Sequence, residues 1–411
     1  MRIEIHVLQN FAPSNLNRDD TGSPKDAEFG GYRRARISSQ CQKRAVRLFF
    51  QKQDLIPQER LAERTKRLVG ETATQLVEKA GKERTAAELA ATEAIKAVMP
   101  KTAADSNGEV KTPYLLFLGR EEIRRFAELV NQHFYKLAAR PPAAATEAET
   151  PAPRRGRGRA ANPAQGPTLP EGFEKAVKGL LDGGKAADLA LFGRMLADLP
   201  EQNVDAACQV AHAISANKIH SMEMDYYTAV DDLKPNDTAG ADMIGTVEFN
   251  SACFYRYANL DLGQLRRNLQ EDMELIPRTA EAFLRAFVQT IPTGKQNTFA
   301  AHNPPSLALA ILRDGPPVSL ANAFVEPARP DHMGNLILNS VRKLDRYYNT
   351  FAPLYGKDDR KVGAMWCEFG DSEIWPEKKE RDSLLKGFRK SDWDAVIESV
   401  LDAAFPSGGA A

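Results

Sequence analysis

The sequence predicts an α+β fold, in which strands come before and after a long helical segment. Residues 3–11 alternate apolar and polar side chains with the period of two that is typical of a half-buried strand. Residues 58–139 and 173–216 carry helical periodicity instead. After residue 217 the alternation returns, so we expect the chain to combine a β-rich part with an α-rich part.

Composition narrows the class of protein. The chain has 411 residues, of which 43% are hydrophobic and 27% charged, which excludes collagen-like, coiled-coil and wholly disordered classes. Its 55 basic residues balance its 55 acidic ones, so a nucleic-acid partner must be sought in the local distribution of charge. The four cysteines are widely spaced, which disfavours a disulfide framework and a zinc ribbon. We expect a cytoplasmic protein, with neither a signal peptide nor a membrane anchor.

The first elements follow from alternation and turn chemistry. A loop rich in Pro, Asn, Asp and Gly runs over residues 13–31, after the first strand. Ser38 or Ser39 then offers a helix N-cap, and Ser39 with Gln42 has the spacing of a capping box. We therefore expect a helix that begins there and reaches about Gln51.

The later elements include an insertion and a hairpin. Residues 140–170 are rich in Pro, Ala, Gly and Arg and predict a disordered surface insertion, because they offer almost nothing to bury. Residues 222–226 alternate, a turn-rich stretch follows, and a long strand is expected over residues 243–257, which together predict a projecting hairpin. A helix is expected over residues 262–290 and a Gly/Pro loop over residues 292–297.

The most distinctive charge pattern lies in residues 32–50, which carry six basic side chains and no acidic one. On a helix, one face would hold Gln40, Lys43, Arg44 and Arg47, and the opposite, core-facing stripe would hold Cys41, Ala45, Leu48 and Phe49. The helix start would add backbone N–H groups and the hydroxyls of Ser38 and Ser39, to which phosphate could bind. A solvated helix face is the alternative, but the absence of interleaved acidic residues favours polyanion binding.

The loop before this helix contains the carboxylates Asp19, Asp20 and Asp26 beside Arg18 and Lys25. Two interpretations stay open. The carboxylates could hold divalent metals for phosphodiester cleavage. They could instead cap turns and pair with neighbouring arginines, which would leave the two cations for phosphates. The second interpretation is favoured, because no histidine or further acidic cluster supplies an obvious base.

Two other segments could contact a ligand. The predicted hairpin carries side chains that could wedge into a base stack, although spacing alone favours a core role for them: Met222, Met224, Tyr226 and Tyr227. The stretch TGKQNTF is similar to a fragment of a phosphate loop but lacks the G-x-x-x-x-G-K-[ST] spacing, which disfavours nucleotide hydrolysis.

Beyond these patterns, the opening IHVLQNFAPSNLNRDDTGSPKDAEFGGYRRARISSQCQKRAVR resembles that of the CRISPR type I-E Cascade backbone subunit, the CasC family. The resemblance returns in ADLALFGRMLAD, VDAACQVAHAISANK, DYYTAVDDLKPNDTAGADMIGTVEFNSACFYRYANLD and PTGKQNTFA. It covers most of the chain outside the insertion, which is not part of the family pattern.

The resemblance implies an architecture like a right hand. An RRM-like (ferredoxin-like) palm would comprise residues 1–57 and 248–411. Helical fingers would comprise residues 58–216, including the disordered insertion at about 140–170, and a β-hairpin thumb would comprise residues 217–247.

The resemblance also implies site residues. Those expected to contact the RNA backbone are Arg18, Lys25, Ser38, Gln40, Lys43, Arg44 and Arg47, with Arg194 and Met195 reaching it from the fingers. The thumb, with the four apolar side chains named above, is expected to fold over the guide and displace a nucleotide at regular intervals.

The resulting expectation is a non-enzymatic, crRNA-binding scaffold that oligomerises along the guide RNA in a Cascade complex and presents it in segments for pairing with target DNA. Its expected partners are the crRNA, target DNA, further copies of itself and other Cascade subunits, without a membrane, metal or cofactor. The alternative is a metal-dependent endoribonuclease that uses the cluster of Asp19, Asp20 and Asp26.

Overall fold

The computed structural model describes residues 1–139, 169–219, 223–227, 245–356, 359–376 and 383–406. These residues confirm the α+β class. The chain forms two compact units: unit 1 comprises Met1–Ile56, Ala207–Arg267 and Glu271–Ala411, and unit 2 comprises Pro57–Ala206 and Asn268–Gln270. Almost all of the predicted insertion at about 140–170 lies outside the described residues, as does Met222.

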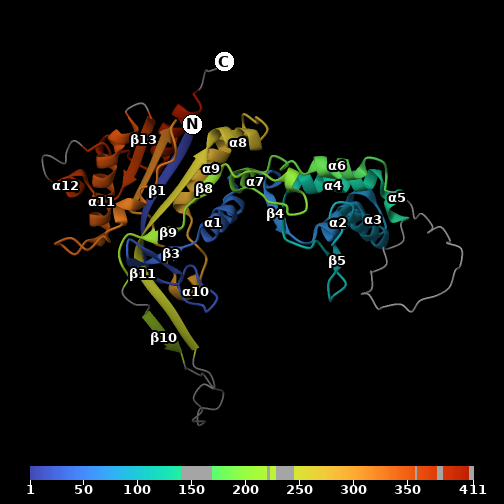
Figure 1. Cartoon of the computed structure of the whole chain (residues 1–411), viewed down its shortest axis with the longest axis horizontal. Helices are drawn as coiled ribbons and strands as arrows, with labels where there is room; N and C mark the ends of the chain where they lie inside the picture. Colours follow the sequence, from blue (N-terminus) through green and yellow to red (C-terminus); the bar gives the residue numbers. More distant parts are fainter. Residues whose placement is uncertain (140–168, 220–222, 228–244, 357–358, 377–382, 407–411) are drawn as a thin grey trace, which may run out of the picture. The chain divides into compact units, whose positions relative to one another are not determined.

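Unit 1 is built on an antiparallel sheet of order β13-β12-β1-β11-β9-β3-β2, and β8 and β10 also pair with β11 (Figure 1). Its strands are β1 (Arg2–Ser14), β2 (Asp26–Phe29), β3 (Tyr32–Ile37), β8 (Cys208–Val210), β9 (Ala213–Ser215), β10 (Glu223–Tyr227), β11 (Gly245–Asp261), β12 (Leu307–Arg313) and β13 (Arg360–Cys367).

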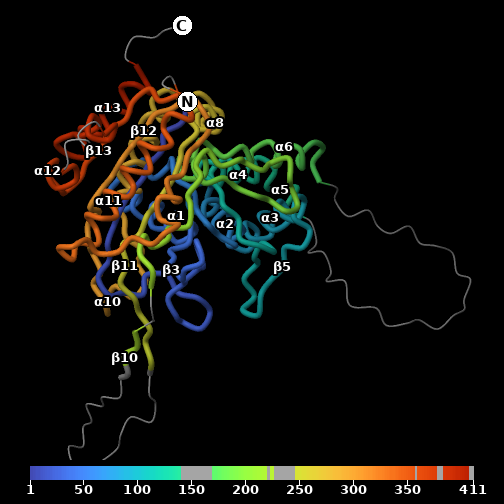
Figure 2. Tube along the Cα trace, turned by 60° about the vertical axis from the view of Figure 1, so that its left-hand side comes forward, coloured from blue at the N-terminus to red at the C-terminus, as the bar shows by residue number. Residues whose placement is uncertain are grey.

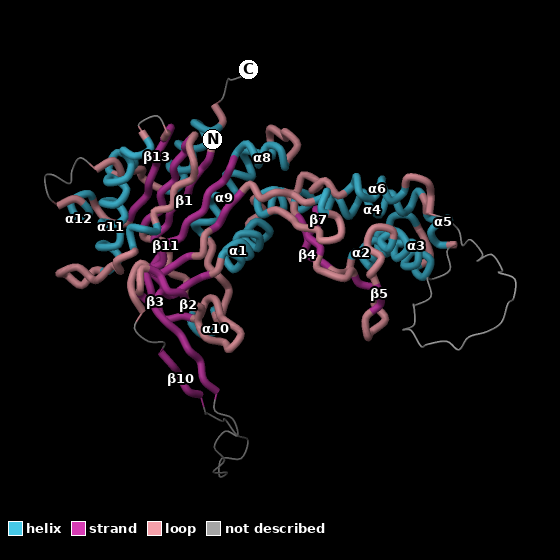
Figure 3. The backbone as a smooth tube through the Cα atoms, in the orientation of Figure 1, coloured by secondary structure: helices cyan, strands magenta, loops and turns pink. Residues whose placement is uncertain are grey.

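Helices pack on both faces of this sheet (Figure 3). They are α1 (Ser39–Lys52), α8 (Leu262–Asn268), α9 (Leu275–Gln289), α10 (Gln296–Phe299), α11 (Leu336–Phe351), α12 (Asp371–Ile374) and α13 (Trp393–Ala404), with the 3-10 turns η3 (Ala321–Phe324), η4 (Ala352–Tyr355) and η6 (Lys386–Phe388). Neighbouring residues of β11 point to opposite faces. Tyr255 joins the apolar core with α11, whereas Arg256 donates to the carbonyl of Phe287 in α9.

Unit 2 is mainly helical. It contains α2 (Leu68–Ala80), α3 (Arg84–Lys96), α4 (Arg120–Gln132), α5 (Phe134–Ala138), α6 (Phe173–Leu180) and α7 (Ala187–Phe192), the turns η1 (Gln58–Arg60) and η2 (Pro200–Gln202), and two strand pairs, β4 (Ala62–Thr65) with β7 (Leu116–Gly119) and β5 (Ala103–Ala104) with β6 (Val110–Lys111). The buried alanines of α3 pack with larger apolar residues of α2 and α4 in one core. Within the described ranges, no helix combines the length and apolar character needed to cross a membrane.

The first strand is more deeply buried than its alternation predicts. Glu4 and His6, expected on a solvent face, are both fully buried. Glu4 accepts from Nε of Arg313 at 2.9 Å, and His6 Nδ1 lies 2.9 Å from the hydroxyl of Tyr255. The polar positions therefore form a buried hydrogen-bonded layer, so the prediction of a half-buried strand is wrong.

Two helical predictions also need correction. Residues 204–216, whose apolar spacing predicts a helix, instead contain β8 and β9, which complete the sheet beside β11. The predicted helix over residues 262–290 is two helices, α8 and α9. The connection contains Gln270 and Glu271, whose positive φ angles of 53° and 55° end the helical path.

The predicted hairpin is present as β10 and β11. Strand β11 pairs with β1 inside the sheet and, at its amino-terminal end, with β10. Figure 2 shows α10 beside the base of this hairpin. There Phe299 of α10 lies against Phe249 of β11, with 5.4 Å between ring centroids. The hairpin is thus anchored to unit 1 at its base.

Gly30 provides a stability test, because it joins β2 to β3 where the backbone passes close to Val325. Both Gly30 and Gly31 have positive φ, but a Cβ at Gly30 would lie 2.3 Å from the Val325 carbonyl oxygen, whereas one at Gly31 would meet nothing within 4 Å. We expect G31A to cost about 1–2 kcal/mol of unfolding free energy through backbone strain alone. G30A should cost about 1–3 kcal/mol more through overpacking.

Tryptophan fluorescence during urea unfolding measures this difference, because Trp366, Trp375 and Trp393 all belong to unit 1. Equal losses for the two variants would contradict the close approach of Gly30 to Val325.

Candidate nucleic-acid interface

The basic face of helix α1 points outward, and the opposite side of the helix, which faces the core, includes the polar residue Gln42. The buried residues are Gln42, Ala45, Val46 and Phe50. The predicted core stripe of Cys41, Ala45, Leu48 and Phe49 is therefore wrong except at Ala45, since the other three are only partly buried. The side chain of Gln42 explains the shift. It donates to the carbonyl of Ala211 at 2.8 Å and accepts from Nε of Arg256 at 3.3 Å.

The start of α1 is capped by Ser38. Its hydroxyl oxygen accepts from the Cys41 N–H at 3.2 Å, as predicted for one of the two candidate caps. The predicted capping box of Ser39 and Gln42 is absent, because the Gln42 side chain points into the core. The Ser39 N–H donates to Nδ1 of His212 at 3.0 Å. Ser38 is buried, and two N–H groups of the first turn already have acceptors, so less of this helix start is available to phosphate than predicted.

Nδ1 of His212 can accept this hydrogen bond only while that nitrogen carries no proton. Burial is the main cause that lowers its pKa, and the charges of Arg36 and Lys25 lower it further. A neutral imidazole has one acceptor nitrogen, and here that nitrogen receives the Ser39 N–H. Burial and these neighbouring charges thus favour the hydrogen bond from the Ser39 N–H at neutral pH.

The structure brings several of the predicted cations together around Cys41. Arg18 and Arg44 are exposed and line a pocket of about 340 Å³ with Cys41 between them. Burial raises the pKa of the Cys41 thiol, and the positive charges of Arg44, Lys25 and Arg256 oppose that rise. Gln40 is exposed one residue before Cys41, and Lys43 and Arg47 are partly exposed along the same helix. Cationic side chains thus lie on both the loop and α1, and Asp19 is the acidic residue that lines the same pocket. We call this region the cationic surface.

A third segment, the loop 292–297, completes this surface, and sequence reasoning missed its role. The hydroxyl of Thr293 accepts from Arg44 at 3.4 Å. A Cβ on Gly294 would lie 2.2 Å from the carbonyl oxygen of Leu16, so only glycine allows the two loops to meet. Lys295 follows with a positive φ of 50°. In the sequence, TGKQNTF was compared only with a nucleotide-binding loop, and that comparison did not indicate its position beside α1.

The carboxylates near this surface have structural partners. Asp19 accepts from the N–H groups of Thr21 and Ser23 at 2.9 and 3.0 Å, and the hydrogen bond from the Thr21 hydroxyl is the largest cause that lowers its pKa. Asp26 forms an ion pair with Arg33. These contacts favour the turn and pairing interpretation. Among the described residues no group of three or more His, Cys, Asp or Glu side chains is placed to hold a metal ion.

The hairpin side chains are only partly described. Met224 is 50% exposed on β10, opposite Glu248, so the core role that spacing favours is wrong for this residue. The backbones of Tyr226 and Tyr227 pair with Thr246 and Gly245. Met222 lies outside the described residues.

Arg194 does not have the predicted RNA-facing position. Its side chain is buried in unit 2, where one guanidinium nitrogen donates to both carboxylate oxygens of Glu122 at 2.9 Å. The other terminal nitrogen donates to the carbonyl of Leu181 at 2.9 Å. Arg194 is thus a structural residue. Met195, by contrast, is 80% exposed, as a contact residue would be.

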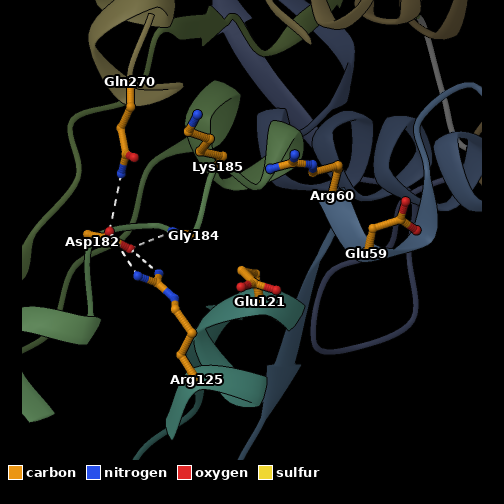
Figure 4. Close-up of a pocket in the computed structure, with 8 residues that line it drawn as sticks. All are labelled: Glu59, Arg60, Glu121, Arg125, Asp182, Gly184, Lys185 and Gln270. Carbon is orange, nitrogen blue, oxygen red and sulfur yellow. Dashed lines mark hydrogen bonds and ion pairs between the residues drawn. The ribbon is translucent and has the colours of Figure 1, made fainter. Parts of the chain in front are cut away.

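Unit 2 also contains a polar pocket of about 420 Å³ (Figure 4). Its charged lining residues are Glu59, Arg60, Glu121, Arg125, Asp182 and Lys185. Asp182 accepts from Arg125 at 2.5 Å and from the Gln270 side chain at 3.2 Å. With three charges of each sign, this pocket lacks the excess of positive charge found around α1, and it is the weaker candidate for a polyanion.

Comparisons with known proteins agree on one class. The profile of a family described as CT1975-like protein matches residues 3–386. The chain is similar to a solved chain titled "CRISPR RNA-guided surveillance complex, pre-nicking", with 29% identity, a TM-score of 0.80 and coverage of 98% of this chain and 100% of that one. A second, titled "CRISPR RNA-guided surveillance complex", has 25% identity, a TM-score of 0.71 and the same coverage. No curated protein sequence matches significantly.

Adjacent substitutions separate the structural role of Arg194 from the exposure of Met195. We expect R194A to cost about 3–5 kcal/mol, because it leaves the Glu122 carboxylate buried without its partner. M195A should change stability by less than about 0.5 kcal/mol. Far-ultraviolet circular dichroism during urea unfolding measures both, and adding E122Q to R194A should recover part of the loss. A stable R194A variant would return this arginine to the list of possible RNA contacts.

Proposed function

Because the chain belongs to the CT1975-like protein family, we propose that it is an RNA-binding backbone subunit of a CRISPR RNA-guided surveillance complex. Both similar structures carry that description, and each match covers 98% of this chain and 100% of the other. Within the class, the resemblance noted in the sequence favours the type I-E Cascade.

The observation that carries the proposal is the cationic surface of α1 and its two flanking loops. Arg18, Lys25 and Arg44 converge around Cys41, while Lys43 and Arg47 continue along the helix. Such a row of cations suits a phosphate backbone, which offers a negative charge at each nucleotide and no sequence information. Base pairing by the guide then reads the target DNA.

The finer architecture belongs to the same proposal. In it, residues 1–57 and 248–411 form the palm, taken as RRM-like, residues 58–216 form the fingers and residues 217–247 form the thumb. The division into two compact units supports a separate finger domain, although it assigns residues 207–216 to unit 1. The exposed Met224 supports a thumb that contacts the guide, since an apolar side chain can lie against bases. Several copies would bind along one crRNA in the cytoplasm, together with other subunits, so that many weak contacts add up.

We also propose that the subunit is not an enzyme. Asp19 and Asp26, two of the three carboxylates of the nuclease alternative, have partners that explain their positions. Asp20 alone would offer a divalent ion a single carboxylate, whereas two-metal cleavage needs several.

Two lysines of α1 test the RNA-binding face. Lys43 lies on the proposed face, and Lys52, nine residues later, lies on the opposite side of the helix at 100° per residue. We expect K43A to weaken single-stranded RNA binding and to flatten the plot of log affinity against log salt by about one unit, because one phosphate contact is lost. K52A should keep both the affinity and the slope. The measurement is fluorescence anisotropy over a salt series, and equal slopes for the two variants would refute the assigned face.

A cleavage assay tests the absence of catalysis. Purified protein bound to labelled RNA should leave the RNA intact after incubation with Mg²⁺ or Mn²⁺, and D20A should behave identically on a denaturing gel. Metal-dependent cleavage that is lost in D20A would establish the endoribonuclease instead.

A further inference from the structure

A buried arginine lies directly beneath the cationic surface. Arg256 belongs to β11 and is 3% exposed. Its guanidinium donates to the side-chain oxygen of Gln9 at 2.6 Å, to that of Gln42 at 3.3 Å and to the carbonyl of Phe287 at 2.6 Å. It also lies over the Phe287 ring, 4.7 Å from the centroid. Each of these partners is formally neutral.

Of the four arginines that are buried among the described residues, two pair with a carboxylate and two do not. Arg194 is equally buried and pairs with Glu122, and Arg313 is buried and pairs with Glu4 and Asp359. Among the described residues Arg256 makes no ion pair. Arg34, the other buried arginine of this kind, is instead held by four backbone carbonyl oxygens.

The surroundings of Arg256 leave its charge uncompensated. Burial lowers its pKa to about 10, and the Cys41 thiol, whose own pKa burial raises, is the group that opposes this effect. An unpaired cation costs folding free energy in a protein interior. An anion that approaches closely enough to feel its field through low-dielectric material would offset part of this cost.

We propose that Arg256 is a buried part of the anion-binding site, whose charge is balanced by the nucleic-acid backbone bound above α1. Two observations place it there: Gln42 connects it to the core side of α1, and Cys41, the residue before Gln42, lines a pocket together with Arg18 and Arg44. Arg256 thus strengthens RNA binding without touching a phosphate. This inference rests on the RNA-binding function proposed above.

The first test uses R256K and R256Q in the full chain, with binding of a short single-stranded RNA measured by fluorescence anisotropy. R256Q removes the charge and should weaken binding about three- to tenfold. R256K retains a charge, but burial lowers the pKa of a lysine at this site, so its charge is present at low pH and lost as the pH rises. Its affinity should therefore be near that of the natural protein at about pH 6 and fall toward that of R256Q by about pH 9.

Other titrating groups do not produce this profile. Cys41 is the titratable group that faces Arg256 from α1, while β1 and α9 contribute Gln9 and Phe287, which do not titrate. The natural protein keeps its arginine charged over this range, so its affinity should vary little with pH. The matched control is R313K, which replaces a buried arginine of the same unit whose charge Glu4 and Asp359 already balance. It should bind RNA like the natural protein at each pH.

A second pair of variants keeps the test valid if the Arg256 variants fold poorly. Q9E places a carboxylate against the guanidinium and neutralises it in position, whereas Q9M removes the same amide without adding charge. Both lose the hydrogen bond from Gln9 to the Asn303 carbonyl, so their difference reports on charge. Q9E should bind RNA about three- to tenfold more weakly than Q9M.

The outcomes separate the two proposals. If the natural protein fails to bind RNA, the proposed function is wrong. If it binds, but R256K shows no pH dependence or Q9E binds as tightly as Q9M, the role of Arg256 is overturned and the proposed function stands. Equal, pH-independent losses in R256K and R256Q, with equal losses of thermal stability, would make Arg256 a purely structural residue.

Discussion

The hydrogen-bonded position of Gln42 is the constraint on which the candidate site depends. A polar side chain in the core of α1 can be satisfied only where both its amide groups find partners, and Ala211 and Arg256 supply them. This requirement fixes the rotation of α1 about its own axis. Arg256 in turn bonds to β1 and α9, so the basic face is oriented by four elements that are distant in sequence. Burial of apolar side chains alone would allow neighbouring rotations, because Leu48 and Phe49, which are only partly buried, are also apolar.

Much of the fold could be predicted from local patterns. The first strand, the helix from Ser39 and the projecting hairpin each have a clear periodicity or cap, and all three are present. The predictions were wrong where residues distant in sequence determine whether a side chain is buried or which secondary structure forms. Glu4 and His6 look solvent-facing in sequence, yet Arg313 and Tyr255 satisfy them in the core. Residues 204–216 have helical spacing, but the open edge of β11 recruits them as strands.

The candidate site was predictable to the extent that it depends on net local charge. Residues 32–50 carry six cations and no acidic residue, and three of these cations lie on α1: Lys43, Arg44 and Arg47. The sequence did not show which of the predicted basic residues are buried. Arg194 and Arg44 are the same residue type. Arg194 is buried and paired with Glu122, whereas Arg44 lines a pocket at the surface. The contribution of Thr293 and Gly294 depends on a loop contact with Leu16 that spans more than 270 positions, which no local pattern encodes.

The continuity of β11 restricts how such a chain can change in length. Because one uninterrupted strand pairs with β1 in the sheet and with β10 in the hairpin, a single inserted residue between these regions would send every later side chain to the wrong face. Arg256 and Tyr255 would exchange their surroundings, placing a cation against α11 and a phenol against α9. A change of length within Gly245–Asp261 is therefore costly, because β11 serves the sheet and the hairpin with one side-chain alternation.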